Sequence, residues 1–351
     1  MTVSNSQSRR LFARLAALAL VCLLFLPALA RAQAGPVGAA TRVWAGATVR
    51  WPDIAYDPEN RVYLNVFGLS GRIVCLFVDS TGAATVGGAF AITNGTFYAQ
   101  TPRASYSPDA HGFLVTWHSS DTSQATTIRA QIVKFSVPQA SGLGTVISDS
   151  IRTTYWEQAA AVAYSPASQR FLVAWPEFDS GGNKDVRARF VDTAGQPVGS
   201  GIVVTGTRND NDRDPAVGYI PDNDTFVVAY AGWNNPASYS YLRTQIVKPD
   251  GTLGASAQLS QTAATYIPEI AYNSATHQIL VGWAQDDPSS GGAIRIFGRL
   301  LDPAGAILGT ANRGNPFARK VIRDGKEFNE DVSDEIVAAI HDLGLDALIV
   351  I

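Results

Sequence analysis

A segment of about 50 residues recurs five times, and this repeat limits the possible folds more than any other feature of the chain. In each copy a tyrosine closes a short apolar run, and another aromatic residue follows eleven positions later. The tyrosines are Tyr56, Tyr106, Tyr164, Tyr219 and Tyr272, at steps of 50, 58, 55 and 53 residues. The constant offset within a varying period indicates a fixed first hairpin, with loops of different length later in each copy.

Each copy predicts four strands. Residues 157–205 show the pattern most clearly, with the runs AAVAY, FLVAW, VRARFVD and GIVVT. In four copies a glycine stands three residues beyond the third run, which suits a tight hairpin turn with positive φ. A lone four-stranded sheet cannot bury both faces, but such units can pack against one another in a ring. We therefore predict an all-β protein, a five-bladed β-propeller of four-stranded repeats with a short α/β appendage at the C-terminus.

The chain divides into three predicted regions. Residues 1–34 are predicted to be an export signal, because Arg9 and Arg10 precede an apolar run and Ala-x-Ala sites. Residues 35–310 form the propeller, and residues 311–351 form a helix–strand tail. The last repeat has no clear fourth run, so we expect residues 41–45 to supply the missing strand. The protein is then periplasmic or extracellular, exported by the general secretory or the twin-arginine route.

Charge and cysteine content exclude several classes of partner. Residues 1–34 hold four arginines and no acid, so the remainder carries a net charge of about −7. No polybasic run occurs, which argues against binding to nucleic acid. No membrane span is expected once the signal is removed, and a monomer is predicted. Cys75 is then the only cysteine, and we expect a buried apolar role for it.

The predicted ligand site lies on one face of the propeller. In an up-and-down sheet the connections between strands two and three, and between successive repeats, share that face, and these loops are long. Binding commonly occurs on long loops held by a rigid scaffold. Aromatic side chains there are suited to stacking on sugar rings or peptide groups, although scattered surface aromatics are also ordinary. The candidate ligand-binding residues are Trp51, Tyr98, Tyr155, Trp156, Trp233 and Tyr266.

One segment suggests a metal. Asp210, Asp212 and Asp214 alternate as oxygen ligands do in calcium loops, but no glycine follows and no glutamate stands at the expected distance. Calcium and a solvated turn both remain open, and no other cofactor is predicted. The four histidines are scattered, and the chain has no P-loop and no Gly-x-Ser-x-Gly motif.

Two family resemblances follow from these motifs. The pattern Pro-x-Val-Ala-Tyr, Phe-Leu-Val-Ala-Trp and Arg-Ala-Arg-Phe-Val-Asp-x-x-Gly resembles repeats of secreted bacterial β-propeller proteins over about residues 36–309. From about residue 305, GAILGTANRGNPF and SDEIVAAIHDLGLDALIVI resemble a truncated piece of 6-phosphofructokinase. That resemblance implies a phosphate-contacting role for Arg313, a helix from Ser333 and a final strand. The fragment lacks the family's catalytic motifs.

Two functions from different classes follow. The first is an exported, non-catalytic binding module for a glycan, peptide or protein. The alternative is an enzyme, either a glycan-active propeller or a 6-phosphofructokinase-like fusion. The side chains at the mouth of the central channel discriminate between them. Three or more carboxylates and an arginine converging there favour the glycan enzyme, whereas their lack favours binding alone.

Overall fold

The structure is a computed structural model. The described residues are 46, 48–83, 88–120, 126–135, 137, 141–148, 160–178, 182–205, 210–234, 239–262, 265–287, 293–308, 319–323 and 326–330. The chain forms two compact units, and all described residues belong to the unit that spans Thr41–Gly344. The other unit, with the predicted export signal, lies outside them.

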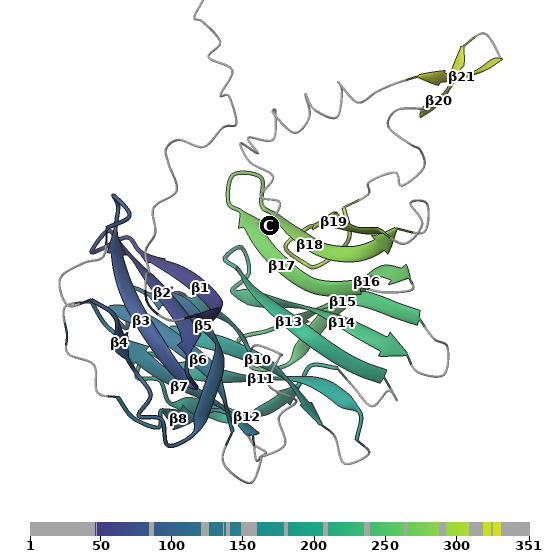
Figure 1. The fold of residues 1–351 in the computed structure, drawn as a ribbon. Helices are drawn as coiled ribbons and strands as arrows, with labels where there is room; N and C mark the ends of the chain where they lie inside the picture. The colour runs from purple at the N-terminus through teal and green to yellow at the C-terminus, as the bar shows by residue number, and fades with distance from the viewer. Residues whose placement is uncertain are drawn as a thin grey trace, which may run out of the picture. The chain divides into compact units, whose positions relative to one another are not determined.

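Each sequence repeat folds into an antiparallel meander (Figure 1). The strands of the first two repeats are β1 (Arg50–Asp57), β2 (Val62–Leu69), β3 (Arg72–Asp79), β4 (Phe90–Ala91), β5 (Tyr98–Ser107), β6 (Gly112–Ser120), β7 (Thr126–Val133) and β8 (Thr145–Val146). The strands of the third and fourth are β9 (Ala161–Ser165), β10 (Arg170–Phe178), β11 (Lys184–Asp192), β12 (Pro197–Val203), β13 (Asp210–Ile220), β14 (Thr225–Asn234), β15 (Tyr239–Val247) and β16 (Leu253–Thr262). The fifth has β17 (Thr265–Asn273), β18 (Gln278–Asp287) and β19 (Ala293–Leu301).

The described residues contain strands and turns but no helix, which confirms the all-β prediction and the β-propeller architecture. Accordingly, they include no helix that could cross a membrane. The third and fourth meanders join into one eight-stranded sheet through a single parallel pairing of Lys184 with Asn211. The number of blades stays a prediction, because residues 41–45, the expected closing strand, lie outside the described residues.

The described part of the last repeat ends just after β19. Ile307 forms an isolated antiparallel bridge with Leu301, and the Leu308 N–H donates to the Leu300 carbonyl at 2.9 Å. The closing strand expected from residues 41–45 stays a prediction.

The tail also differs from the sequence expectation where it is described. β20 (Arg319–Arg323) and β21 (Lys326–Glu330) form an antiparallel hairpin. We had predicted only one helix and one strand for the tail. The expected helix from Ser333 and the strand over residues 346–351 lie outside the described residues, as does Arg313.

The turns between third and fourth strands follow the glycine rule. Gly82, Gly195, Gly251 and Gly305 have φ between 79° and 86°, and each N–H donates to the carbonyl three residues earlier. A side chain is strained in this left-handed region, whereas glycine is not. The predicted hairpin turns are confirmed.

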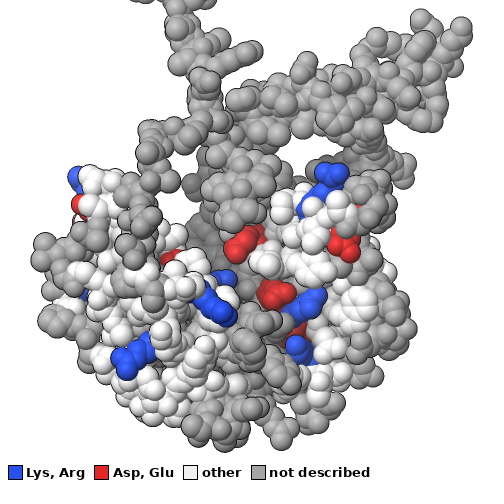
Figure 2. All heavy atoms as spheres, viewed as in Figure 1, with Lys and Arg blue, Asp and Glu red and all other residues white. Residues whose placement is uncertain are grey.

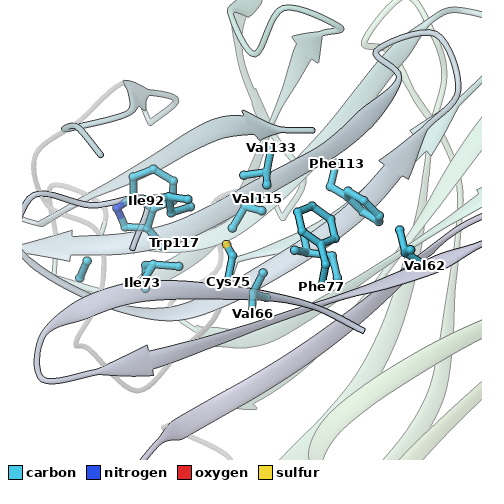
Figure 3. Close-up of a cluster of buried hydrophobic side chains, with 12 residues drawn as sticks. Val62, Val66, Ile73, Cys75, Phe77, Ile92, Phe113, Val115, Trp117 and Val133 are labelled. Carbon is cyan, nitrogen blue, oxygen red and sulfur yellow. The ribbon is translucent and has the colours of Figure 1, made fainter. Parts of the chain in front are cut away.

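The core lies between adjacent meanders. Figure 3 shows one such cluster, in which Phe77 and Cys75 of β3 face Phe113 and Trp117 of β6. Cys75 is free and fully buried, as expected, and burial raises the pKa of its thiol. The thiol therefore stays protonated and acts as a small apolar group. Packing of this kind between sheets replaces the internal core that one four-stranded sheet lacks.

Three of the repeated tyrosines connect their meander to the one before it. The Tyr106 hydroxyl donates to Glu59 at 3.3 Å, the Tyr164 hydroxyl to Asp109, and the Tyr272 hydroxyl to Asp222. Each acceptor lies in the first turn of the preceding repeat. These three tyrosines are therefore structural residues between neighbouring meanders, as predicted, whereas Tyr56 of the first repeat is 43% exposed.

Candidate functional site

The first strands of four repeats share a β-bulge. Their registers shift between Arg50 and Asp53 in β1, and at the corresponding places in β5, β13 and β17. At each bulge a residue with positive φ precedes a proline, in the pairs Trp51-Pro52, Thr101-Pro102, Asp214-Pro215 and Ile267-Pro268. Proline cannot donate to a sheet ladder, so bulges are among the few places where a strand tolerates it. Bulges also redirect side chains, often next to active sites.

The bulged strands meet at one cavity of about 160 Å³. All five first strands contribute to its lining: Trp51, Thr101, Arg103, Ala161, Val162, Asp214, Pro215, Ala216, Val217, Ile267, Pro268, Glu269 and Ile270. Such convergence of innermost strands is what the repeat predicts for the channel of a propeller. On the face shown in Figure 2, acidic and basic side chains lie next to one another near the middle. We call this site the central cavity.

The charged residues of the central cavity occupy equivalent repeat positions. Asp53, Arg103 and Glu269 each follow the proline of their bulge, while alanines stand at that position in the third and fourth repeats. Arg103 and Glu269 line the cavity, and Asp53 acts electrostatically on Glu269. This position lies in the first strand of every repeat, and in three repeats it carries a charged side chain.

Burial of Asp53 outweighs the contacts that stabilise its anion, so the pKa of its carboxyl is raised. Burial raises the pKa of the Asp53 carboxyl, while the Ala104 N–H, which donates to Oδ2 at 2.8 Å, and the Arg103 guanidinium act to lower it. A hydrogen bond and a cation both stabilise a carboxylate relative to the acid. Asp53 is therefore a carboxyl with a raised pKa whose anion has a hydrogen-bond donor and a cation nearby.

The pKa of Glu269 is raised as well. The surrounding protein walls raise the pKa of Glu269 by removing water, the Arg103 guanidinium opposes this, and the Asp53 charge raises the pKa further. The side chain nevertheless remains open to solvent from the cavity. Glu269 is therefore the carboxyl better suited to remain protonated and to donate a proton.

A third carboxyl completes the group. Desolvation raises the pKa of Asp214, and the nearby Arg213 and Lys184 charges act to lower it. The Arg213 Nε lies 3.6 Å from the Asp214 carboxylate, and the Arg213 guanidinium stacks 5.6 Å from the Tyr266 ring centroid. Asp214 is thus a fixed acceptor on the cavity wall, held between two cations.

A second pocket of about 400 Å³ adjoins the central cavity. Thr48, Arg50, Trp51, Gly68, Ser70, Gly71, Tyr98 and Ala99 line it. Two of these, Trp51 and Tyr98, are aromatic residues that the sequence nominated, and Trp51 lines both spaces. The pocket lies where β1 and β5 begin and β2 ends, on the face predicted to bind a ligand. We call it the Trp51 pocket.

The other nominated residues have separate positions. The Tyr266 ring contacts the Arg213 guanidinium, which in turn lies next to Asp214 of the central cavity. Trp233 is partly buried on β14 and lines neither the central cavity nor the Trp51 pocket. Tyr155 and Trp156 lie outside the described residues.

The three proposed calcium ligands do not share one site. Asp212 is buried and accepts a hydrogen bond from the Tyr241 hydroxyl, while the bulge turns Asp214 to the central cavity. The side chain of Asp210 is not described. Among the described side chains, no group of three or more His, Cys, Asp or Glu residues is arranged to hold a metal ion.

Sequence reasoning missed the charged residues that follow the prolines. The signal was present, because Pro52, Pro102, Pro215 and Pro268 each stand four residues before a repeat tyrosine. A proline inside an apolar strand run predicts a bulge, and the next residue carries a charge in three repeats.

Comparison with known proteins gives similarity at the level of the fold. No family model matches the chain, and no curated protein matches it. A protein of unknown function from Dyadobacter fermentans has a TM-score of 0.51 and 10% identity, over 75% of this chain and 83% of that one.

Two further solved structures are weaker matches. A thermostable family-43 glycoside hydrolase has a TM-score of 0.43 at 9% identity, over 80% of this chain and 92% of that one. An endo-arabinase from Bacteroides thetaiotaomicron has a TM-score of 0.42 at 10% identity, over 79% and 96%. These scores carry no functional argument, so the assignment below rests on the cavity.

Proposed function

We propose that this protein is a glycan-active enzyme that hydrolyses a glycosidic bond in the central cavity. The observation that carries the proposal is that Asp214, Glu269 and Arg103 line one cavity on the innermost strands, while Asp53 acts electrostatically on Glu269. Carboxyl groups beside an arginine in the central channel favour a glycan enzyme over a binding module. Glycoside hydrolysis uses two carboxyl groups on either side of the scissile bond, one as an acid and the other as a base or nucleophile.

The environments of the two carboxyls assign their roles. Glu269 is the general acid, since burial and the Asp53 charge both favour its protonated form. Asp53 is the base or nucleophile, since the Ala104 N–H and Arg103 oppose the rise in its pKa that burial causes. Two carboxyls whose surroundings move their pKa values apart can perform acid and base chemistry at one pH.

Arg103 links the pair, because its charge acts to lower the pKa of both carboxyls. It stabilises the negative charge that remains at Asp53, and its guanidinium is anchored by a hydrogen bond to the Pro102 carbonyl at 3.2 Å. Asp214, held by Arg213 and Lys184, accepts hydrogen bonds from sugar hydroxyls and orients the ring. Positioning of this kind contributes to rate by fixing the reacting groups.

Release of reducing ends from a panel of polysaccharides tests this proposal. The panel contains neutral, acidic and sulfated glycans, and the control is the Asp53→Asn protein. We expect the purified protein to release oligosaccharides or monosaccharides from at least one member, and the Asp53→Asn variant to do so about 10²-fold or more slowly. Cleavage by both proteins at the same rate, or cleavage of no member by either, contradicts the proposal.

A further inference from the structure

The Trp51 pocket has two aromatic walls that glycines hold in place. A Cβ at Gly71 would lie 2.6 Å from the Tyr98 ring, and one at Gly68 would lie 3.2 Å from the Trp51 ring. The first distance is shorter than real contacts, and φ at Gly71 is 75°, so this position requires glycine. The Ala99 N–H also donates to the Gly71 carbonyl at 2.8 Å. The β2–β3 turn therefore packs against the Tyr98 ring, and the end of β2 packs against the Trp51 ring.

The two rings remain available to a ligand. The Tyr98 residue is 54% exposed, although it is anchored on one side by the β2–β3 turn. Trp51 is partly buried. Flat aromatic faces held in this way favour stacking with rings, and they lose little conformational entropy on binding because they are already positioned.

The charge of the Trp51 pocket differs from that of the central cavity. Arg50 is the one charged residue among its described lining residues, and its guanidinium lies 5.7 Å from the Trp51 ring centroid. Thr48 and Ser70 add hydroxyl groups. The central cavity, by contrast, holds Asp214 and Glu269 in its lining. An arginine beside stacking rings matches a ligand ring that carries a negative group.

We infer that the Trp51 pocket is a subsite for an anionic sugar unit of the glycan chain that the central cavity cleaves. Trp51 lines both spaces, so one chain can occupy them together. Trp51 and Tyr98 stack on the sugar ring, and Arg50 binds its carboxylate or sulfate. The role as an extension of the cleavage site rests on the proposed function, whereas binding of the anionic sugar is measured independently.

The experiment is calorimetric binding to the Glu269→Gln protein, which keeps its ligands uncleaved. The probes are tetragalacturonate, a sulfated carrageenan tetrasaccharide and neutral xylotetraose. We expect one of the anionic probes to bind about tenfold or more tightly than xylotetraose, because a charge-assisted hydrogen bond of this kind contributes roughly that factor. The tighter of the two shows whether the recognised group is a carboxylate or a sulfate. The preference should weaken with added salt, since the charges are exposed.

Two further substitutions, each made in the Glu269→Gln protein, identify the side chains that bind the probe. Arg50→Gln should abolish the preference for the anionic probe and leave xylotetraose binding unchanged. For every probe that binds, Tyr98→Ala should lower the affinity about tenfold, because the stacking contact is lost. Arg61→Gln is the matched control, because Arg61 lies in the first turn and Gln169 occupies the same position in the third repeat. It should change nothing.

The outcomes separate this inference from the proposed function. Equal affinity for anionic and neutral probes, no binding of any probe, or a preference that survives Arg50→Gln overturns the inference. Binding with the expected Arg50 and Tyr98 dependence, together with no cleavage of any glycan by the unmodified protein, supports the anionic-sugar site and rejects the proposed function.

Discussion

Replacing Glu269 by glutamine should reduce glycan cleavage by about 10²–10⁴-fold, the usual contribution of a general acid or base. Glutamine keeps the size of the side chain but has no acidic proton to transfer to the leaving oxygen. The measurement is kcat on the best glycan of the panel. Because the acid acts in the chemical step, kcat should fall while binding of the uncleaved glycan changes little.

The pH profile gives a second test of the same assignment. Activity should fall at high pH as Glu269 loses its proton, and at low pH as Asp53 gains one. Burial raises the pKa of both carboxyls, and the Asp53 charge adds to the rise at Glu269. The midpoints of both limbs of the pH profile should therefore lie above the pKa values of free aspartate and glutamate side chains. If the Glu269→Gln protein retained activity with an unchanged high-pH limb, Glu269 would not be the acid.

Stability measurements exclude unfolding as the cause of lost activity. A raised pKa in the folded state means that folding disfavours the charged carboxylate, so Glu269 lowers stability above its folded-state pKa and has no such effect below its unfolded-state pKa. Stability attributable to Glu269 thus falls as pH rises through that interval. The Glu269→Gln protein should be as stable as the unmodified protein at neutral pH, or more stable.

The largest loss of stability should come from Trp175→Ala, at about 3–5 kcal/mol in the free energy of unfolding. Trp175 on β10 is fully buried between the second and third meanders, among Leu114, Ile128 and Phe171. Truncation leaves a large cavity that the rigid sheets cannot fill. The indole N–H also donates to the Glu177 carboxylate at 2.9 Å, and Glu177 is buried. Urea unfolding measures the effect.

Two comparison variants separate the parts of this effect. Trp175→Phe keeps much of the packing and removes the indole donor, so its cost should be smaller, about 1–3 kcal/mol. The other is Tyr98→Ala, which removes an exposed ring and should change stability by about 0.5 kcal/mol or less. If Trp175→Ala lowered the free energy of unfolding by less than about 1 kcal/mol, the contacts between these meanders would not be a main source of stability.

Much of the fold was predictable because local chemistry determines it. The tyrosine at each repeat and the aromatic residue eleven positions later predicted a hairpin packed between neighbours, and Tyr164 does lie against Asp109 of the preceding repeat. Glycine at Gly82 and Gly195 predicted left-handed turns, because other residues are strained there. Both patterns depend on the local conformation of a few neighbouring residues, which the sequence alone can predict.

The site was less predictable because it depends on long-range convergence. Asp53 and Glu269 are more than two hundred residues apart in the sequence, and only the arrangement of the first strands brings them close enough to interact electrostatically. Each alone looks like a polar residue in a strand. Likewise Asp212 and Asp214 alternate in the sequence as metal ligands do, but the bulge after Arg213 separates them.

The most direct test of the account is the crystal structure of the Glu269→Gln protein with the oligosaccharide that the unmodified protein cleaves. We predict a glycosidic oxygen within about 2.6–3.2 Å of the side chain at position 269, with the sugar carbon of the same bond facing Asp53. Arg103 should lie beside both groups, and the chain should extend over Trp51. An oligosaccharide bound with its scissile bond away from Asp53 and position 269 would contradict the account.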